Sequence, residues 1–241
     1  MTHAPQPIRI DPETIDLRPL DLDPAGFQSP LPVQHYSLIY EDAAIGLAVG
    51  IWDTTTMQEA FGPYPGDEYI TVLDGGFAMV DAAGGTLAAA QAGDSVTFRN
   101  GAPSSWKQKG YLRKVYLTLQ DPKGTTPALA SAKGGFCVLD RARAPQGSPD
   151  ADGVTREVVF RNDAGTMTVT LCVFPARILP PAPCPSHRLI RVLAGAITLT
   201  GPATPPDRFD AGTHVFLPKG TTCAWETGAG TVAIFVDVTA D

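Results

Sequence analysis

Glu68 and Arg188 are the charged residues whose positions most suggest chemistry, because they occupy equivalent places in an internal repeat. Residues 67–75 (DEYITVLDG) align with residues 187–195 (HRLIRVLAG). A carboxylate can act as a general base or anchor a ligand, whereas a guanidinium donates hydrogen bonds and can bind a carboxylate or phosphate bidentately. The two copies have therefore exchanged an acceptor for a donor at the same place.

The repeat also indicates the elements that position these residues. Residues 92–106 (AGDSVTFRNGAPSSW) align with residues 211–225 (AGTHVFLPKGTTCAW), so the tryptophans Trp106 and Trp225 are equivalent. A repeat separated by about 120 positions is too long for a solenoid unit, so each copy should be a small domain. The 24 Gly and 23 Pro residues favour many turns and short strands. We therefore predict an all-β chain of two antiparallel barrels or sandwiches.

The predicted organisation has four parts. Residues 1–34 are a proline-rich N-terminal arm, residues 35–120 the first barrel, residues 121–154 a linker and residues 155–241 the second barrel. Within the linker, residues 136–140 (FCVLD) are expected to add a strand or to pack against one copy.

Composition excludes several classes of partner. The net charge is −7 and no run of Lys or Arg occurs, so nucleic acid and anionic membranes are not expected to bind. No apolar stretch is long enough to span a membrane, the start lacks the apolar centre of a signal peptide, and the four cysteines show no CxxC spacing. These features predict a cytoplasmic protein with free thiols. Signatures of catalytic triads, kinases and dinucleotide enzymes are absent from the sequence.

Both copies resemble cupins in the spacing of their motifs. Glu68 and Gly75 keep the E(x)6G spacing of the first cupin motif, and residues 212–220 match the G(x)5PxG of the second. The first copy is similar to the family related to ureidoglycine aminohydrolase and to the ethanolamine-utilisation cupins, through residues 50–55 (GIWDTT), 64–75 (YPGDEYITVLDG) and 113–116 (RKVY). This resemblance implies a bicupin of two tandem jelly-roll barrels, also called double-stranded β-helices.

The resemblance also implies where a metal would bind. Cupins generally hold divalent iron, manganese, nickel or zinc with three His and one Glu that point into the barrel. In the first copy Glu68 is present, but the His positions fall among residues 61–64 and at Ser104. We therefore expect neither a metal nor another cofactor in the first barrel.

Glu68 then has two possible roles. It is either a structural acid paired with Arg113 or Lys114, or a catalytic base or ligand anchor in an apolar cup. In the second case Tyr64, Trp106 and Lys114 would bind the ligand beside it.

The second copy places Arg188 at the Glu position and Cys223 at the His position of the second motif. Cys184 and His187 lie close by in the sequence. Three interpretations remain open for this cluster. The cysteines are unrelated small buried residues, or Cys184, His187 and Cys223 bind a divalent transition metal, or the cysteines form a reversible disulfide or a thiolate activated by Arg188.

Arg188 and the two equivalent tryptophans have alternatives of their own. Arg188 either binds an anionic ligand or pairs with Asp207 or Asp210. Trp106 and Trp225 either close their barrels or form a stacking wall for a planar ligand.

These observations support three functional hypotheses, and whether the protein is an enzyme stays open. The first is a small-metabolite-binding bicupin of nitrogen or carbon metabolism without the usual metal, in a sensing or acid/base role. The second is a metal-dependent enzyme of the aminohydrolase or dioxygenase kind, and the third is a structural or regulatory module. A homodimer is plausible through the sheet edges and the arm.

Overall fold

The computed structural model describes residues 4–202 and 204–239. The chain forms two compact units: a first unit of residues 12–141, and a second unit of residues 142–241 together with residues 1–11, as far as these are described. Apart from one 3₁₀ turn, η1 (Pro24–Gly26), the secondary structure of the described residues consists of strands. None of the described helical residues forms a helix that could cross a membrane.

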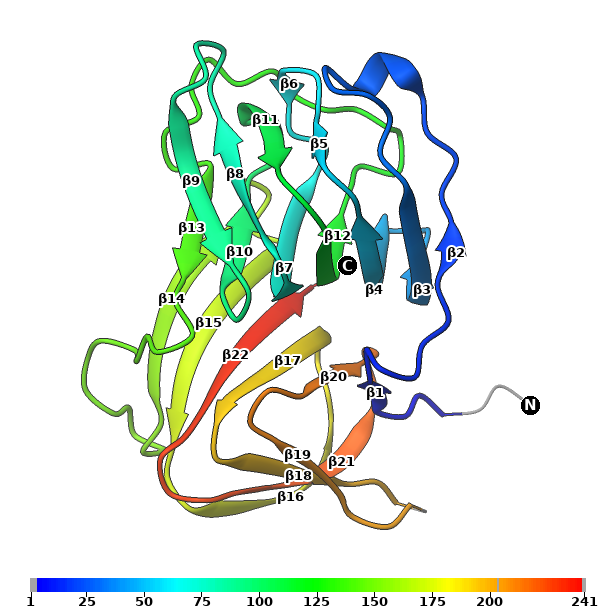
Figure 1. Ribbon diagram of the computed structural model, residues 1–241. Helices are drawn as coiled ribbons and strands as arrows, with labels where there is room; N and C mark the ends of the chain where they lie inside the picture. The colour runs from blue at the N-terminus through cyan, green and yellow to red at the C-terminus, as the bar shows by residue number, and fades with distance from the viewer. Residues whose placement is uncertain (1–3, 203, 240–241) are drawn as a thin grey trace. The chain divides into compact units, whose positions relative to one another are not determined.

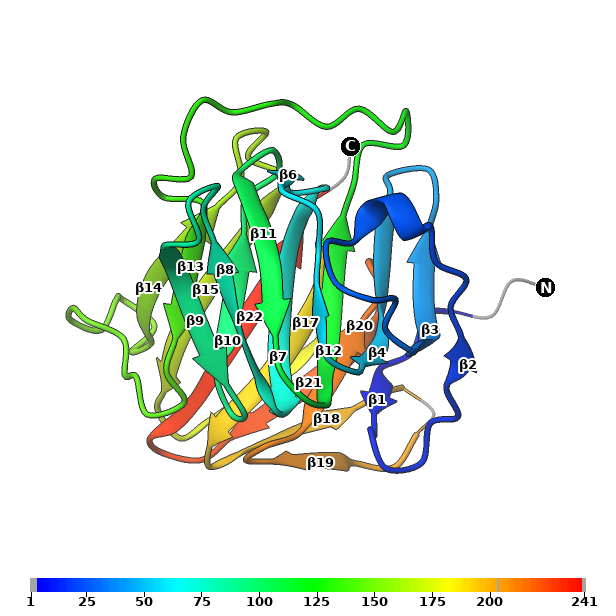
Figure 2. The same ribbon diagram turned by 45° about the horizontal axis from the view of Figure 1, so that its top comes forward.

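The first unit contains two antiparallel sheets (Figure 1). The larger has the order β13-β10-β7-β12-β4-β3-β2, and the smaller has the order β5-β11-β8-β9, with β6 also paired to β11. Figure 2 shows β8, β9 and β11 of the smaller sheet side by side. The strands are β2 (Arg18–Pro19), β3 (Gln34–Asp42), β4 (Leu47–Thr54), β5 (Met57–Gln58), β6 (Gly62–Pro63), β7 (Asp67–Asp74), β8 (Gly76–Val80), β9 (Thr86–Gln91), β10 (Ser95–Phe98), β11 (Pro103–Gln108), β12 (Leu112–Leu119) and β13 (Phe136–Leu139).

The second unit repeats this arrangement. Its larger sheet has the order β1-β20-β17-β22-β15-β14, and its smaller sheet has the order β16-β21-β18-β19. The strands are β1 (Ile8–Ile10), β14 (Thr155–Arg161), β15 (Met167–Phe174), β16 (Arg177–Pro183), β17 (His187–Ala194), β18 (Ala196–Thr200), β19 (Asp207–Asp210), β20 (His214–Leu217), β21 (Thr222–Thr227) and β22 (Thr231–Val238).

The aligned segments of the sequence fold into equivalent strands. Residues 67–75 form β7 and its turn, as residues 187–195 form β17 and its turn, and the order β10-β7-β12-β4 corresponds to β20-β17-β22-β15. Gly75 and Gly195 end these strands with φ of +75° and +71°. This left-handed conformation favours glycine because a Cβ would crowd the backbone. The predicted all-β fold of two tandem jelly-roll barrels is confirmed.

The edge position next to β10 and β20 is filled from different parts of the chain in the two units. In the first unit β13 pairs with β10, and it comes from residues 136–140, which were expected to add a strand. In the second unit β1 pairs with β20 and comes from the N-terminal segment. The described part of the expected arm is therefore divided, since β1 joins the second unit and β2 pairs with β3 of the first. Residues 1–3 of that arm lie outside the described residues. The boundaries given above for the barrels and linker stay a prediction.

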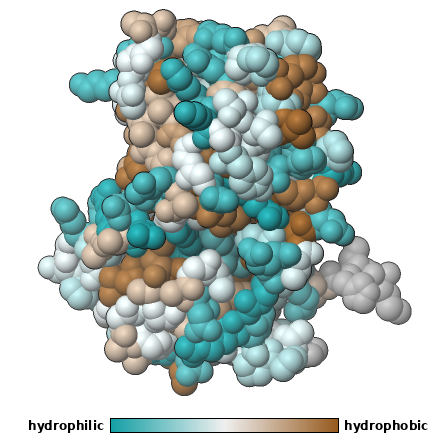
Figure 3. Space-filling view, in the orientation of Figure 1, coloured by the Kyte–Doolittle hydropathy of each residue, from teal (hydrophilic) through white to brown (hydrophobic). Residues whose placement is uncertain are grey.

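Each unit has its own apolar core, filled by the inward-facing side chains of both sheets. In the first unit Ile70 and Val72 of β7 pack with Phe98 and Trp106. The equivalent residues of β17, Ile190 and Val192, lie in the separate core of the second unit. On the face shown in Figure 3, hydrophobic residues lie in separate small patches among hydrophilic ones. Glu68 and Arg188 stand two residues before the core residues Ile70 and Ile190. Because side chains alternate along a strand, the inward faces of β7 and β17 also carry Glu68 and Arg188.

Candidate functional site

The first unit contains a cavity of about 370 Å³ that is lined by Glu68 and Lys114. Glu68 lies on β7 and Lys114 on the neighbouring strand β12. Alternation along a strand places Lys114 on the same inward face as Leu112, which belongs to the core. The remaining walls come mainly from Gln34, Tyr36, Trp52, Glu59, Tyr64 and Tyr116. The cavity is thus an aromatic cup with a polar centre.

Glu68 forms the polar centre with two partners. Its Oε1 accepts a hydrogen bond from Lys114 Nζ at 2.9 Å, and its Oε2 accepts one from the Tyr64 hydroxyl. The side chains of Glu68 and Lys114 are only 6% and 10% exposed, so this ion pair is buried. A buried carboxylate with both oxygens occupied is held in one orientation. Of the two partners expected from the sequence, Lys114 pairs with Glu68, while Arg113 donates a hydrogen bond to the carbonyl oxygen of Pro12.

Two tryptophans surround the Lys114 ammonium. Its Nζ lies 4.9 Å from the ring centroid of Trp52 and 5.0 Å from that of Trp106, within the range of cation–π attraction. Gln34 fixes the Trp52 ring by accepting a hydrogen bond from its indole nitrogen at 3.2 Å. The positive charge therefore has a defined position at the base of the cup.

Glu59 is a second carboxyl group in the same cavity, and the sequence analysis missed it. It follows β5, and its backbone N–H donates to the Trp106 carbonyl oxygen at 2.9 Å. Burial raises the pKa of Glu59 to about 7, Lys114 opposes that rise, and the charge of Glu68 adds to it. A carboxyl group with a pKa near neutral pH can both give and take a proton there. Sequence spacing did not reveal it because Glu59 belongs to no motif.

Two tyrosines of the cup, Tyr64 and Tyr116, stay protonated. Burial, and then the Glu68 charge, raise the pKa of Tyr64 well above its usual value. Burial also raises the pKa of Tyr116 to about 12, with Glu68 again contributing. Both phenols are therefore hydrogen-bond donors at neutral pH.

The side chains around Glu68 are not a suitable ligand set for a divalent metal. The Lys114 ammonium is hydrogen-bonded to one oxygen of Glu68, the carboxylate at the cupin Glu position. Ser104, which stands at a cupin His position, donates its hydroxyl hydrogen to the carbonyl oxygen of Ala102 at 3.2 Å. Among the described residues, no group of three or more His, Cys, Asp or Glu side chains has the arrangement of a metal site. Divalent transition metals bind imidazole, thiolate and carboxylate ligands, and an ammonium at that place repels them.

Trp106 closes its barrel, the first of the two roles considered from the sequence. Its ring stacks on Phe77 at a centroid distance of 3.7 Å, its indole N–H donates to Gln108, and it is 2% exposed. These contacts make it part of the core that closes the barrel. It also lines the cavity.

The second unit contains a separate cavity of about 420 Å³. Arg188 and Trp225, the two ligand-binding residues predicted in this copy, both line it. The sequence suggested Asp207 or Asp210 as the acid that would neutralise Arg188. Instead Arg188 Nε donates to Asp237 Oδ1 at 2.7 Å. Asp237 lies on β22, the strand that pairs with β17.

The residues of the alternative metal set are only partly brought together. Cys184 and Cys223 belong to the inward-facing core, whereas His187 lies on the opposite face of β17 from Arg188. His187 stacks with Phe216, and its Nδ1 accepts a hydrogen bond from the Lys219 backbone. His187 therefore does not join the two cysteines.

The two cysteines themselves are free thiols. Burial raises the pKa of Cys223 to about 11, so the thiol is its form at neutral pH. This argues against a thiolate activated by Arg188 at that position.

Comparisons with known proteins agree with this architecture. Residues 46–116 match the family model of the EutQ-like cupin domain. A protein of unknown function of the DUF861 family from Pseudomonas syringae pv. tomato superimposes with a TM-score of 0.71 at 18% identity, covering 98% of this chain and 100% of that one. A putative dioxygenase from Nostoc punctiforme gives a TM-score of 0.68 at 14% identity, covering 98% of this chain and 83% of that one. The DUF861 protein Ylba from E. coli gives 0.58 at 11% identity, with coverage of 100% and 94%.

Among curated protein sequences, none matches the chain. The structural likenesses are too low in identity to carry a reaction, but they extend over the whole chain and include both barrels. The chain is therefore a bicupin in fold, and its first half carries a EutQ-like cupin domain.

Proposed function

We propose that the first unit binds a small organic metabolite in the cup around Glu68 and exchanges a proton with it through Glu59. The observation that carries this proposal is that the buried Glu68–Lys114 pair and a second carboxyl group, Glu59, line the same cavity of about 370 Å³. A structural ion pair alone would need neither the cavity nor Glu59. Clefts with a few convergent polar groups and perturbed pKa values are typical of binding and catalytic sites.

The residues of the cup would divide the work. Lys114 supplies a fixed positive charge beside Glu68, the carboxylate at the cupin Glu position, and Tyr64 holds the other oxygen of that carboxylate. Glu59, with a pKa of about 7, gives or takes the proton. This assigns the acid/base role to Glu59 instead of Glu68, because Glu68 is already engaged by two donors.

The charges of the cup favour a neutral or weakly basic ligand. Glu68 and Lys114 offset each other, so the ionisation of Glu59 makes the cup net negative. Small amides and amines fit this arrangement, since their N–H groups can donate to Glu59 and a carbonyl oxygen can accept from Lys114 or Tyr116. A role in nitrogen metabolism, expected from the sequence, accords with such ligands.

Ligand-induced shifts of the indole N–H signals in NMR spectra test this proposal. The chain has three tryptophans, Trp52, Trp106 and Trp225, and the first two line the cup. We expect small amides or amines to shift the Trp52 and Trp106 signals. Their binding should change with a midpoint near pH 7 in the wild type, set by the pKa of Glu59, and lose this dependence in Glu59→Gln.

Two controls sharpen the test. Lys114→Met should abolish the shifts, whereas Lys109→Met, at an exposed position, should leave them unchanged. If none of the amides and amines moves either signal, the proposal is wrong. If they bind without pH dependence near 7, Glu59 is not the proton-transfer group and the cup is a sensor.

Three further expectations stay proposals. A homodimer, a cytoplasmic location and the absence of a metal rest on the sequence arguments given above. Size measurement in solution, fractionation of cells and metal analysis of purified protein test them separately.

A further inference from the structure

The cavity of the second unit has largely apolar walls and is also lined by three arginines, Arg156, Arg177 and Arg188. Arg188 lines it together with the aromatic residues Phe174, Trp225 and Phe235. The prolines and small residues of β16 and the segment that follows complete it, among them Pro180, Ala182 and Pro183. A ligand in this cavity would therefore meet a mainly apolar surface with a few charged groups, of which Arg188 is the one beside the aromatic residues.

The orientation of Arg188 is fixed from behind. Its Nε donates to Asp237 Oδ1 at 2.7 Å, and its guanidinium carbon lies 4.7 Å from the ring centroid of Phe235. Ser186 donates to the same Asp237 oxygen and holds that carboxylate in place. Within residues 4–202 and 204–239, the structure gives the two Nη atoms of Arg188 no hydrogen-bond partner. These two nitrogens form the edge that matches the two oxygens of a carboxylate.

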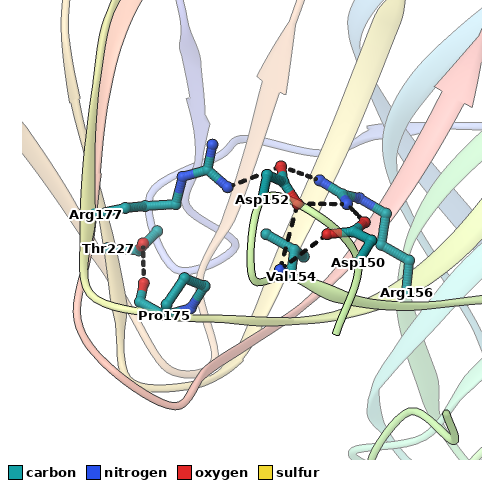
Figure 4. A network of polar contacts seen from close by, with 7 residues as sticks. All are labelled: Asp150, Asp152, Val154, Arg156, Pro175, Arg177 and Thr227. Carbon is teal, nitrogen blue, oxygen red and sulfur yellow. Dashed lines mark hydrogen bonds and ion pairs between the residues drawn. The ribbon is translucent and has the colours of Figure 1, made fainter. Parts of the chain in front are cut away.

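The other two arginines around the cavity are already neutralised. Figure 4 shows Arg156 and Arg177 turned toward the aspartates Asp150 and Asp152. Arg156 makes two bonds to Asp152, each of 3.0 Å, and contacts Asp150, while Arg177 Nη1 lies 3.0 Å from Asp152 Oδ2. The three arginines are thus balanced in charge by Asp150, Asp152 and Asp237, and the two unbonded Nη atoms of Arg188 remain as donors that can hold one carboxylate. A phosphate dianion would also meet the negative charge of Asp152, which lines the cavity as well.

From these contacts we propose that the second unit binds a small carboxylic acid with an apolar body, whose carboxylate is held by the Nη1 and Nη2 atoms of Arg188. The apolar body packs against Trp225, Phe174 and Phe235. This site is separate from the cup of the first unit and differs from it in charge, because the first cup favours neutral or basic ligands. The inference does not depend on the function proposed for the first unit.

The test uses the full-length protein and pairs of probes that differ only in charge. The carboxylates are acetate, isovalerate, benzoate and phenylacetate, and each is compared with its amide. The indole N–H signal of Trp225, assigned with Trp225→Phe, reports binding in the second unit, and those of Trp52 and Trp106 report binding in the first. We expect at least one of the larger carboxylates to shift the Trp225 signal with an affinity about tenfold or more above that of its amide.

Variants connect the binding to Arg188. Arg188→Gln should weaken binding of the carboxylate about tenfold or more and leave binding of the amide unchanged. Arg188→Lys keeps a charge beside Asp237 but loses the two-pronged donor, so it should also weaken carboxylate binding and serves if the Gln variant does not fold. Arg208→Gln removes an equally paired but exposed arginine, which lies 2.8 Å from Asp210 on β19, and should change nothing.

Four results would overturn the proposal. One is equal affinity for carboxylate and amide, and another is a shift confined to the signals of Trp52 and Trp106. The third is that no member of the panel moves the Trp225 signal. Inorganic phosphate binding more tightly than every carboxylate would also contradict it, because Asp152 in the lining repels the second negative charge of a phosphate dianion.

Discussion

Removal of the Lys114 ammonium should strongly destabilise the first unit. In Lys114→Met the similar-sized side chain keeps the volume but leaves the Glu68 carboxylate buried, at 6% exposure, without its cation. Breaking a buried ion pair by removing one partner costs about 3–5 kcal/mol, because the remaining charge is uncompensated. The two cation–π contacts of Nζ, at 4.9 and 5.0 Å, are lost as well. We therefore expect a loss of about 3–5 kcal/mol in the free energy of unfolding.

A double-mutant cycle separates this effect from a simple loss of packing. Glu68→Gln in the Lys114→Met background replaces the unpaired charge by a neutral amide, whose oxygen can still accept the Tyr64 hydrogen bond. The double variant should therefore be more stable than Lys114→Met alone. The coupling energy between the two positions should lie near the upper end of the range of about 0.5–3 kcal/mol seen for residues in contact.

Urea unfolding followed by tryptophan fluorescence measures these free energies. The two units can unfold separately, so the measurement is made in a Trp225→Phe background, where both remaining tryptophans lie in the first unit. Lys109→Met, at an exposed position, is the control and should change stability by less than about 0.5 kcal/mol. Additive effects of the Lys114 and Glu68 variants, or a cost for Lys114→Met below about 1 kcal/mol, would refute the reasoning, because the pair would then not be a coupled buried centre.

Three other measurements test particular residues. Because folding raises the pKa of Glu59 from 4.5 to about 7, its contribution to stability is present below about pH 4.5 and is lost as pH rises through 7. The free energy of unfolding of the wild type, measured with urea, should therefore fall relative to that of Glu59→Gln over that window, by up to about 3 kcal/mol. Parallel pH dependences of the two proteins would contradict this. In native protein at neutral pH, a thiol reagent should react with half-buried Cys137 before buried Cys223, because burial raises the pKa of Cys223 to about 11. Peptide mapping that shows the reverse order would be evidence against this. Gly75→Ala should destabilise the protein more than Gly84→Ala. Both glycines have positive φ, but only at Gly75 would the new Cβ meet a backbone oxygen, at 2.1 Å. Equal losses of free energy in urea unfolding would show that the contact relaxes.

The repeat in the sequence was sufficient to predict the two barrels. Two segments of the same spacing and glycine positions must form the same strand and turn, so the equivalence of β7 and β17 followed from residues 67–75 and 187–195. The edge strands were harder to predict. The same place beside β10 and β20 is taken by β13 and β1, which come from segments with no sequence likeness in the alignment. An edge needs only a few residues of backbone pairing, and that leaves little pattern in a sequence.

The candidate sites divide in a similar way. Glu68, Tyr64, Trp106 and Lys114 were predicted and do lie around one cavity, because strand neighbours and motif spacing determine which side chains point inward. Glu59 was missed because its place depends on how the segment after β5 meets β11, which no local pattern shows.

The partner of Arg188 was missed for a related reason. Asp237 lies close to it only because β17 and β22 pair in a register that sets these two residues opposite each other. That register depends on the packing of both sheets and not on the sequence near Arg188.

Strand parity by itself excludes one of the alternatives for the second copy. His187 and Arg188 are the first two residues of β17, and consecutive side chains in a strand point to opposite faces. If Arg188 points into the barrel at the cupin Glu position, His187 must point away from it and cannot join Cys184 and Cys223 inside. The structure shows this arrangement, with His187 stacked on Phe216, whose strand neighbours Val215 and Leu217 face the core instead. A ligand set inferred from a sequence should therefore be checked for parity on its strand before its chemistry is considered.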